Sequence, residues 1–217
     1  MNTITQYSII GLLCLPAIST ISYAQESDMS FGIHGNIVGS SGKPSNDVPG
    51  IGLIGNYQLK DKWFVDIELI YSEADFERPW QVLGIVQDET TVKTIDSVYT
   101  SILIMAQMGQ NISGGSRSYD YYWSAGLGFN SIDADDVSGP VEGGGTFNIS
   151  TDAGTEIIVG GKLGIKQHLS DSWSMNYAMR IDYHLADWTV TDTVSSTTAK
   201  IDDYTTYGIL IGVQKKF

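Results

Sequence analysis

Hydrophobic and polar residues alternate along most of the chain with a period of two, which is the pattern of β-strands. Over 63–72, Trp63 and every second residue after it are apolar, whereas the positions between them include Asp66, Glu68 and Ser72. The alternation recurs over 119–130, 173–184 and 207–214, and in weaker form over 31–37, 51–59, 98–106 and 156–166. The sequence therefore predicts eight strands of about ten residues, the length that a tilted strand needs to cross a bilayer.

The connections between these segments alternate in length. Short connections follow the second, fourth and sixth segments (60–62, 109–118 and 168–172), and long ones follow the first, third, fifth and seventh (39–49, 73–94, 131–153 and 186–203). Short turns on one side and long loops on the other are typical of outer-membrane barrels. We predict an all-β fold: a closed eight-stranded antiparallel transmembrane β-barrel with short periplasmic turns and long extracellular loops.

Aromatic residues mark both ends of the predicted strands. Those at the periplasmic ends are Phe31, Trp63, Tyr119, Trp173 and Phe217, and those at the outer ends are Tyr71, Phe129, Tyr183 and Tyr207. Two belts of amphipathic rings are favoured by the two interfaces of a membrane. A soluble β-sandwich, the alternative reading of the alternation, gives no reason to expose rings in two belts.

The N-terminus follows a different pattern. Ile9–Ala17 form a short apolar core, and Ser22 and Ala24 place small residues three and one before a possible cleavage point, as in an exported signal. We predict a cleaved signal peptide over 1–24 and an outer-membrane barrel domain over 25–217. The alternative is an apolar N-terminus of a cytosolic domain, since 1–8 contain no Lys or Arg. The only Cys, Cys14, lies in this segment, so the mature chain has no disulfide or thiolate site.

The charge of the chain argues against nucleic-acid binding and bears on metal binding. Lys plus Arg number 12 and Asp plus Glu number 25, giving a net charge of -13, so the chain repels nucleic acid. The long connections are acidic, and Asp133, Asp135 and Asp136 suggest Ca²⁺, but the Gly and the closing Glu of a helix-loop-helix calcium site are missing. We expect no specific metal site and no cofactor, only weak and non-specific ordering of solvated outer loops by divalent cations.

An export signal, eight alternating segments and the C-terminal segment Ile209–Phe217 together resemble the small eight-stranded outer-membrane β-barrel proteins of Gram-negative bacteria, the OmpA-like, OmpX/Ail-like and OmpW-like group. Phe217, with apolar residues at alternate positions before it, resembles the assembly signal of that group, although Lys215 departs from the pattern. The resemblance implies export through the periplasm to the cell outer membrane. The implied partners are outer-membrane lipid and lipopolysaccharide, the barrel-assembly machinery and an external ligand at the loops.

The predicted lumen is rich in titratable side chains, although an eight-stranded barrel is only wide enough for its own side chains. The inward positions hold His34, Asp66, Glu68, Asp120, Glu156, Lys162, Lys166, Arg180, Asp182 and His184. Buried charges must pair, and both signs are present. We predict a structural network that plugs the lumen, and the alternative is a gate or narrow ion path.

Catalysis finds little support in the sequence. Some small barrels modify lipid A, which needs a nucleophile and a base. His184 beside Asp182 could join Ser195 in a triad, but no spacing recommends it, and His168 falls on the periplasmic side. We therefore predict no catalytic residues and a non-enzymatic structural or surface-interaction role of the adhesion or colonisation type. The alternatives are an OmpW-like narrow channel for small or apolar molecules and, third, a lipid A-modifying enzyme.

Overall fold

The computed structural model describes residues 29–40, 48–59, 62–75, 98–112, 118–141, 144–152 and 154–217. The predicted signal peptide, 1–24, lies outside these residues. None of the described residues belongs to a helix long and apolar enough to cross a membrane.

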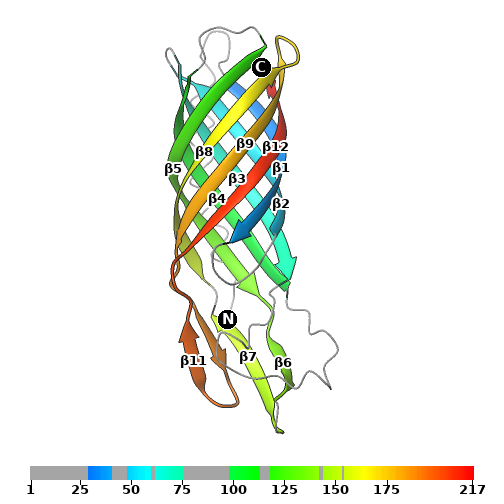
Figure 1. Ribbon diagram of the computed structural model, residues 1–217, viewed down its shortest axis with the longest axis vertical. Helices are drawn as coiled ribbons and strands as arrows, with labels where there is room; N and C mark the ends of the chain where they lie inside the picture. The colour runs from blue at the N-terminus through cyan, green and yellow to red at the C-terminus, as the bar shows by residue number, and fades with distance from the viewer. Residues whose placement is uncertain are drawn as a thin grey trace.

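Eight strands form a closed barrel (Figure 1). They are β1 (Met29–Ser40), β2 (Val48–Gln58), β3 (Trp63–Asp75), β4 (Val98–Asn111), β5 (Tyr119–Ala134), β8 (Thr155–His168), β9 (Trp173–Leu185) and β12 (Tyr204–Lys216). Each is antiparallel to the barrel strand that follows it in the chain, and β12 pairs with β1 to close the wall. The predicted fold class is confirmed. We call the end of the barrel with the short connections the turn end, and the opposite end the loop end.

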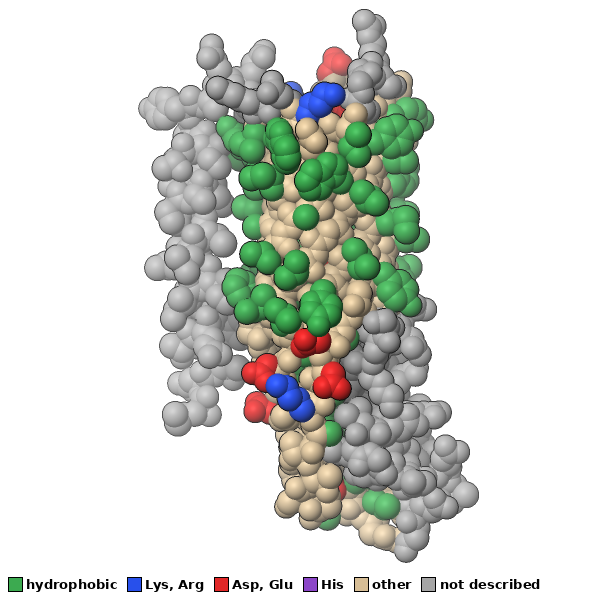
Figure 2. Space-filling model, turned by 60° about the vertical axis from the view of Figure 1, so that its left-hand side comes forward, with side chains coloured by type: hydrophobic (Ala, Val, Ile, Leu, Met, Phe, Trp, Pro, Cys, Tyr) green, Lys and Arg blue, Asp and Glu red, His purple; other side chains and the backbone are tan. Residues whose placement is uncertain are grey.

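Side chains alternate between the two faces of the wall as the sequence predicts. On β9, Met179 and Ile181 are 70% and 59% exposed, whereas Arg180 and Asp182 between them are 4% and 3% exposed. Figure 2 shows hydrophobic side chains spread over the face of the barrel wall that is in view. All nine aromatic residues of the two predicted belts are exposed, from 38% for Trp63 to 62% for Phe217.

Glycines on the inner face leave room for larger side chains of the neighbouring strands. A Cβ added to Gly52 would collide with the His34 imidazole, and one added to Gly164 would collide with the Tyr122 ring. Small and large residues therefore alternate across the lumen, so that side chains fill the interior of the barrel.

A second sheet lies beyond the loop end (Figure 1). This outer sheet has the order β11-β10-β7-β6, formed by β6 (Val137–Pro140), β7 (Thr146–Asp152), β10 (Thr189–Asp192) and β11 (Thr197–Lys200). Strands β6 and β7 come from the connection between β5 and β8, β10 and β11 come from the connection between β9 and β12, and β7 pairs with β10.

The outer sheet corrects one expectation. The connections 131–153 and 186–203 are expected from the sequence to be solvated loops, whereas much of both is regular β-structure. Its cause is a separate hydrophobic core, in which Phe147, Ile149 and Val190 are 0%, 1% and 0% exposed. Burial of this apolar surface supplies the driving force that ordering two long connections requires.

Candidate functional site

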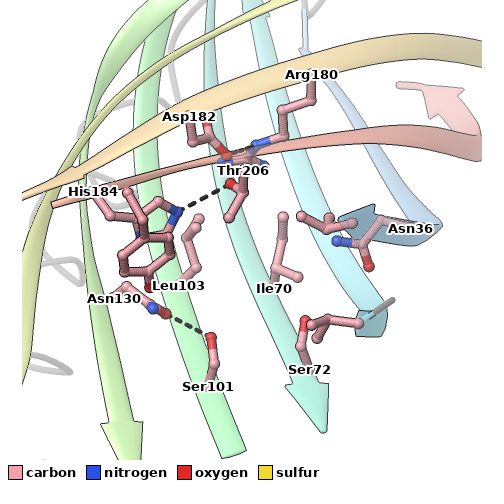
Figure 3. A pocket seen from close by; sticks show the side chains of 13 residues that line it. Asn36, Ile70, Ser72, Ser101, Leu103, Asn130, Arg180, Asp182, His184 and Thr206 are labelled. Atoms are coloured by element: carbon pink, nitrogen blue, oxygen red, sulfur yellow. Dashed lines mark hydrogen bonds and ion pairs between the residues drawn. The ribbon is translucent and has the colours of Figure 1, made fainter. Parts of the chain in front are cut away.

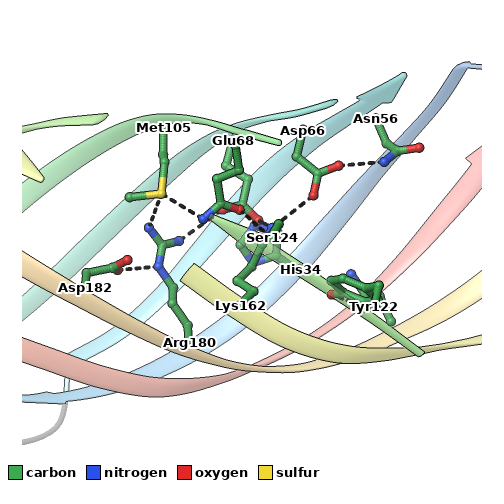
Figure 4. Close-up of polar contacts among 12 residues, drawn as sticks. His34, Asn56, Asp66, Glu68, Met105, Tyr122, Ser124, Lys162, Arg180 and Asp182 are labelled. Carbon is green, nitrogen blue, oxygen red and sulfur yellow. Dashed lines mark hydrogen bonds and ion pairs between the residues drawn. The ribbon is translucent and has the colours of Figure 1, made fainter. Parts of the chain in front are cut away.

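The polar lumen side chains lie at three levels along the barrel axis. The middle level is a central cluster of Asp66, Glu68, Lys162, Arg180 and Asp182, none of which is more than 4% exposed (Figure 4). Lys162 Nζ lies 2.6 Å from Glu68 Oε1 and 3.2 Å from Asp66 Oδ2. Arg180 Nη1 lies 3.1 Å from Glu68 Oε2, and its Nε donates to Asp182. Each cation thus bridges two carboxylates from different positions of the wall.

Neighbouring residues complete the central cluster. Asn56 Nδ2 donates to Asp66 Oδ1 at 2.6 Å, and Arg180 Nη2 lies 3.4 Å from Met105 Sδ. The His34 Nε2 atom lies 3.9 Å from Glu68 Oε1, and neither ring nitrogen of His34 hydrogen bonds to a described residue. Paired charges with additional hydrogen bonds are the arrangement in which buried ions are tolerated.

The second level, at the loop end, is centred on the Glu156 carboxylate, which is 1% exposed. It accepts hydrogen bonds from Trp188 Nε1 at 2.7 Å, from Tyr204 OH at 3.0 Å and from Asn130 Nδ2 at 3.3 Å. His184 Nδ1 lies 2.9 Å from Glu156 Oε2, and its ring stacks on Tyr204 with a centroid distance of 4.3 Å. We call these five residues the Glu156 cluster.

Trp188 connects the Glu156 cluster to the outer sheet. Its ring belongs to the hydrophobic core beneath that sheet and is 2% exposed, while its indole N–H reaches the inward carboxylate of strand β8. Hydrogen bonds to a charged acceptor are among the stronger ones in proteins. The Glu156 cluster therefore ties the outer sheet to the barrel wall.

A small cavity separates the central cluster from the Glu156 cluster (Figure 3). Its volume is about 60 Å³, and Arg180, Asp182 and His184 contribute to its lining. Hydrogen bonds from Ser101 to Asn130 and between His184 and Thr206 run along its wall. A cavity of this size holds a few waters and no larger solute.

The third level lies at the turn end, where two of the sequence-predicted lumen residues are separated from the central cluster. Asp120 Oδ2 lies 2.7 Å from His168 Nε2, a residue that the sequence analysis placed in a turn and outside the network. Lys166 also faces inward, but it forms no ion pair with a described residue. Of the ten predicted lumen residues, Asp120 and Lys166 are thus the two that lie apart from the two buried clusters.

Ser195 and His184, the serine and histidine of the conceivable triad, bond to different partners. Ser195 lies between β10 and β11, and its Oγ donates to Asp192 Oδ2 at 2.5 Å. The Ser195 hydroxyl, followed by the backbone N–H of Asn148, lowers the pKa of Asp192 to about 2. His184 is engaged instead by Glu156 and Thr206 in the barrel.

Metal-binding geometry is also lacking in the part of the chain that the structure describes. Its His, Asp and Glu side chains form no group of three or more that could hold a metal ion. The weak ordering of the outer loops by divalent cations stays a prediction, because it requires no such group.

Sequence reasoning missed Trp188, Tyr204 and Asn130 as partners of Glu156. A signal for the outer sheet was present, since Phe147 and Ile149 alternate with polar residues and Val190 lies between two threonines. These runs are shorter than a membrane-crossing strand, which is why a search for crossing strands passes over them.

Comparison with known proteins identifies the architecture. Residues 10–217 match the family model described as outer membrane protein beta-barrel domain. A major outer membrane protein from Thermus thermophilus is similar in structure, with a TM-score of 0.55 and 8% identity over 87% of this chain and 99% of that one. Neisserial surface protein A gives a TM-score of 0.49 and 15% identity over 87% and 96% of the two chains. Ail of Yersinia pestis gives a TM-score of 0.48 and 14% identity over 88% of this chain and 97% of that one. No curated protein matches the chain.

Proposed function

The chain belongs to the outer membrane protein β-barrel family, and from this premise we propose that it is a non-enzymatic barrel with a closed polar lumen and an outer sheet that serves for interactions outside the cell. The short connections then face the periplasm, and the outer sheet lies beyond the extracellular end of the barrel.

The observation that carries this proposal is the outer sheet with its own hydrophobic core. A barrel that only needs to fill the membrane is complete without it, because all of its strand pairs are formed within the wall. Ordered β-structure outside the membrane offers a surface of fixed shape, which lowers the entropic cost of binding a partner.

The central cluster supports the closed lumen. Lys162 and Arg180 link acids of β3 and β9 across the lumen, and their charges would have to separate before a solute could pass. Separating these groups would leave charges uncompensated in the buried lumen, which strongly disfavours opening.

The proposed partners follow from the location. Outer-membrane lipid and lipopolysaccharide surround the exposed apolar band of the wall. Recognition by the barrel-assembly machinery involves the C-terminal strand with Phe217, which packs edge-to-face on Phe31 with a centroid distance of 6.1 Å. An external ligand binds at the outer sheet.

A deletion tests the surface role. In the variant, a short Gly-Ser linker replaces β10 and β11, and unboiled gel mobility verifies that the barrel still folds. Cells of a non-adherent Gram-negative host that display the intact protein should be retained on host-cell monolayers, and cells that display the deletion should not. Equal retention of both strains would contradict the proposed role of the outer sheet.

A narrow channel is the second candidate, and the internal cavity of about 60 Å³ favours it. Asn36 Oδ1 and Asp182 Oδ1 are buried there without a hydrogen-bond partner among the described residues, so bound water is expected beside them. Conductance in planar bilayers separates the two functions. The closed barrel gives no steady single-channel current, and the channel gives a current that changes in Lys162→Met.

A further inference from the structure

The turn end of the lumen contains a polar vestibule of about 240 Å³. It lies among inward side chains of the wall, the β8–β9 turn and the last residues of β12, including Lys166, His168, Ser174 and Lys216. A smaller cavity of about 10 Å³, shared by Lys166 and Asp66, continues from it toward the central cluster. Lys162 closes the lumen at that level through its two ion pairs, so the vestibule is blind toward the loop end.

Lys166 lines both cavities, and its ammonium group has no carboxylate within ion-pair distance in the described chain. The two carboxylates that interact electrostatically with the Lys166 ammonium group, Asp66 and Asp120, are each paired with another side chain. Asp120 pairs with His168 at 2.7 Å, and Asp66 pairs with Lys162 at 3.2 Å and accepts from Asn56. Lys166 is partly buried, and its ammonium group has three donors with which to hold a ligand in the vestibule.

Further donors line the same vestibule. Lys216 adds a second ammonium group near the end of β12, and Ser174, which is 8% exposed, adds a hydroxyl directly across the strand pair from His168. The carboxylates of Asp120, which pairs with His168, and of Asp171 also line the vestibule, so the two ammonium groups and the hydroxyls are the donors available there to an oxyanion.

The charges of the described residues also favour an anion at the turn end. The described acids beyond or at the loop end are Glu73, Asp133, Asp135, Asp136, Asp152, Asp187, Asp192, Asp202 and Asp203, against one base, Lys200. The described turn end reverses the balance, with Lys62, Lys166, Lys215 and Lys216 against Asp120 and Asp171. Such a separation directs anions to the turn end and away from the loop end.

We propose that this vestibule is a periplasmic binding site for a small phosphate-bearing anion, held mainly by Lys166. The anion comes from either a soluble phosphate ester or the headgroup of an inner-leaflet phospholipid. The phospholipid is included because Trp173 lines the vestibule and also lies under the Lys215 ammonium group at the outer surface of the rim. The site is independent of the role of the outer sheet.

Calorimetric titration of the refolded full barrel tests the proposal. The soluble probes are inorganic phosphate and glycerol phosphate, added to protein in neutral detergent. The lipid probe is phosphatidylglycerol, and phosphatidylcholine is its control, each in nanodiscs that hold the barrel. Lipid binding is measured as a shift of the indole N–H resonance of Trp173. Saturable binding of the soluble probes, or a Trp173 shift only with phosphatidylglycerol, supports the site and identifies the source of the anion.

The variants decide whether Lys166 holds the anion. Lys166→Met should weaken binding at least tenfold, because it removes the main charge, while unboiled gel mobility stays that of the folded barrel. Lys62→Met, a matched change at an exposed lysine in the β2–β3 turn, should leave binding within twofold of the original. Absence of saturable binding to every probe would overturn the proposal, as would equal binding by the folded Lys166→Met protein.

Discussion

Replacing Trp188 should release the outer sheet while leaving the barrel intact. The ring is 2% exposed within the core of the outer sheet, and its N–H donates to Glu156 at 2.7 Å. Truncation of a buried Trp to Ala costs about 3–5 kcal/mol. Trp188→Phe keeps most of the ring but removes the hydrogen bond to a charged acceptor, which costs about 1.5–3 kcal/mol.

These free energies apply to local opening of the outer sheet, because the barrel strands pair without it. At about 1.4 kcal/mol per factor of ten, the open population rises by about two to three and a half orders of magnitude in Trp188→Ala. In Trp188→Phe it rises by about one to two orders.

Limited proteolysis in detergent measures this population when the sheet opens and closes faster than the protease cuts. Mass spectrometry should locate new cleavage within 131–153 and 186–203, and the unboiled gel mobility of the barrel should not change. Val194→Ala is the matched control, since Val194 is 59% exposed in the same sheet connection. If Trp188→Ala is cut no faster than Val194→Ala, then Trp188 does not hold the outer sheet to the barrel.

Four further outcomes are expected. Because every strand of the wall is paired, the protein should migrate differently on a detergent gel before and after boiling; identical migration with no β-signal in circular dichroism would contradict the barrel. Met179→Arg places a charge on the lipid face near mid-membrane and should cost about 2–4 kcal/mol, measured by denaturant unfolding in micelles. Arg180→Ala leaves Glu68 with one fewer partner and should lower folding yield, whereas assembly equal to that of the unmodified protein would contradict the pairing. The Ser195 hydroxyl lowers the pKa of Asp192 from its ordinary 3.8 to about 2, so this carboxylate stabilises the β10–β11 turn above pH 4 and loses that effect between pH 4 and 2. Amide exchange in the turn should rise over that range, and Asp192→Asn should remove this pH dependence.

The barrel wall could be predicted from the sequence because one physical rule governs every strand. A lipid face and a lumen face force a period of two, and two interfaces select aromatic residues at the strand ends. The inward direction of Arg180 and Asp182 and the outward direction of Ile181 follow from this rule, and the structure places all three accordingly.

The partners of the inward side chains could not be predicted in the same way. Alternation fixes the face of a residue, but the tilt and stagger of the strands fix its level along the axis. Asp120 and Lys166 therefore face the lumen as expected, yet they lie at the turn end, away from Lys162 and Arg180. Trp188 could not be assigned to Glu156, because their contact depends on how two connections pack together.

The pairing of β7 with β10 has a consequence for the order of biogenesis. The two strands belong to connections separated by the whole of β8 and β9, so neither hairpin can complete the outer sheet alone. Both connections must have crossed the membrane as unfolded chain before they meet, since a folded sheet is too wide to pass through a side-chain-filled barrel. The outer sheet therefore forms only after both connections have crossed, and a protease-resistant outer sheet marks molecules in which translocation of both connections is complete.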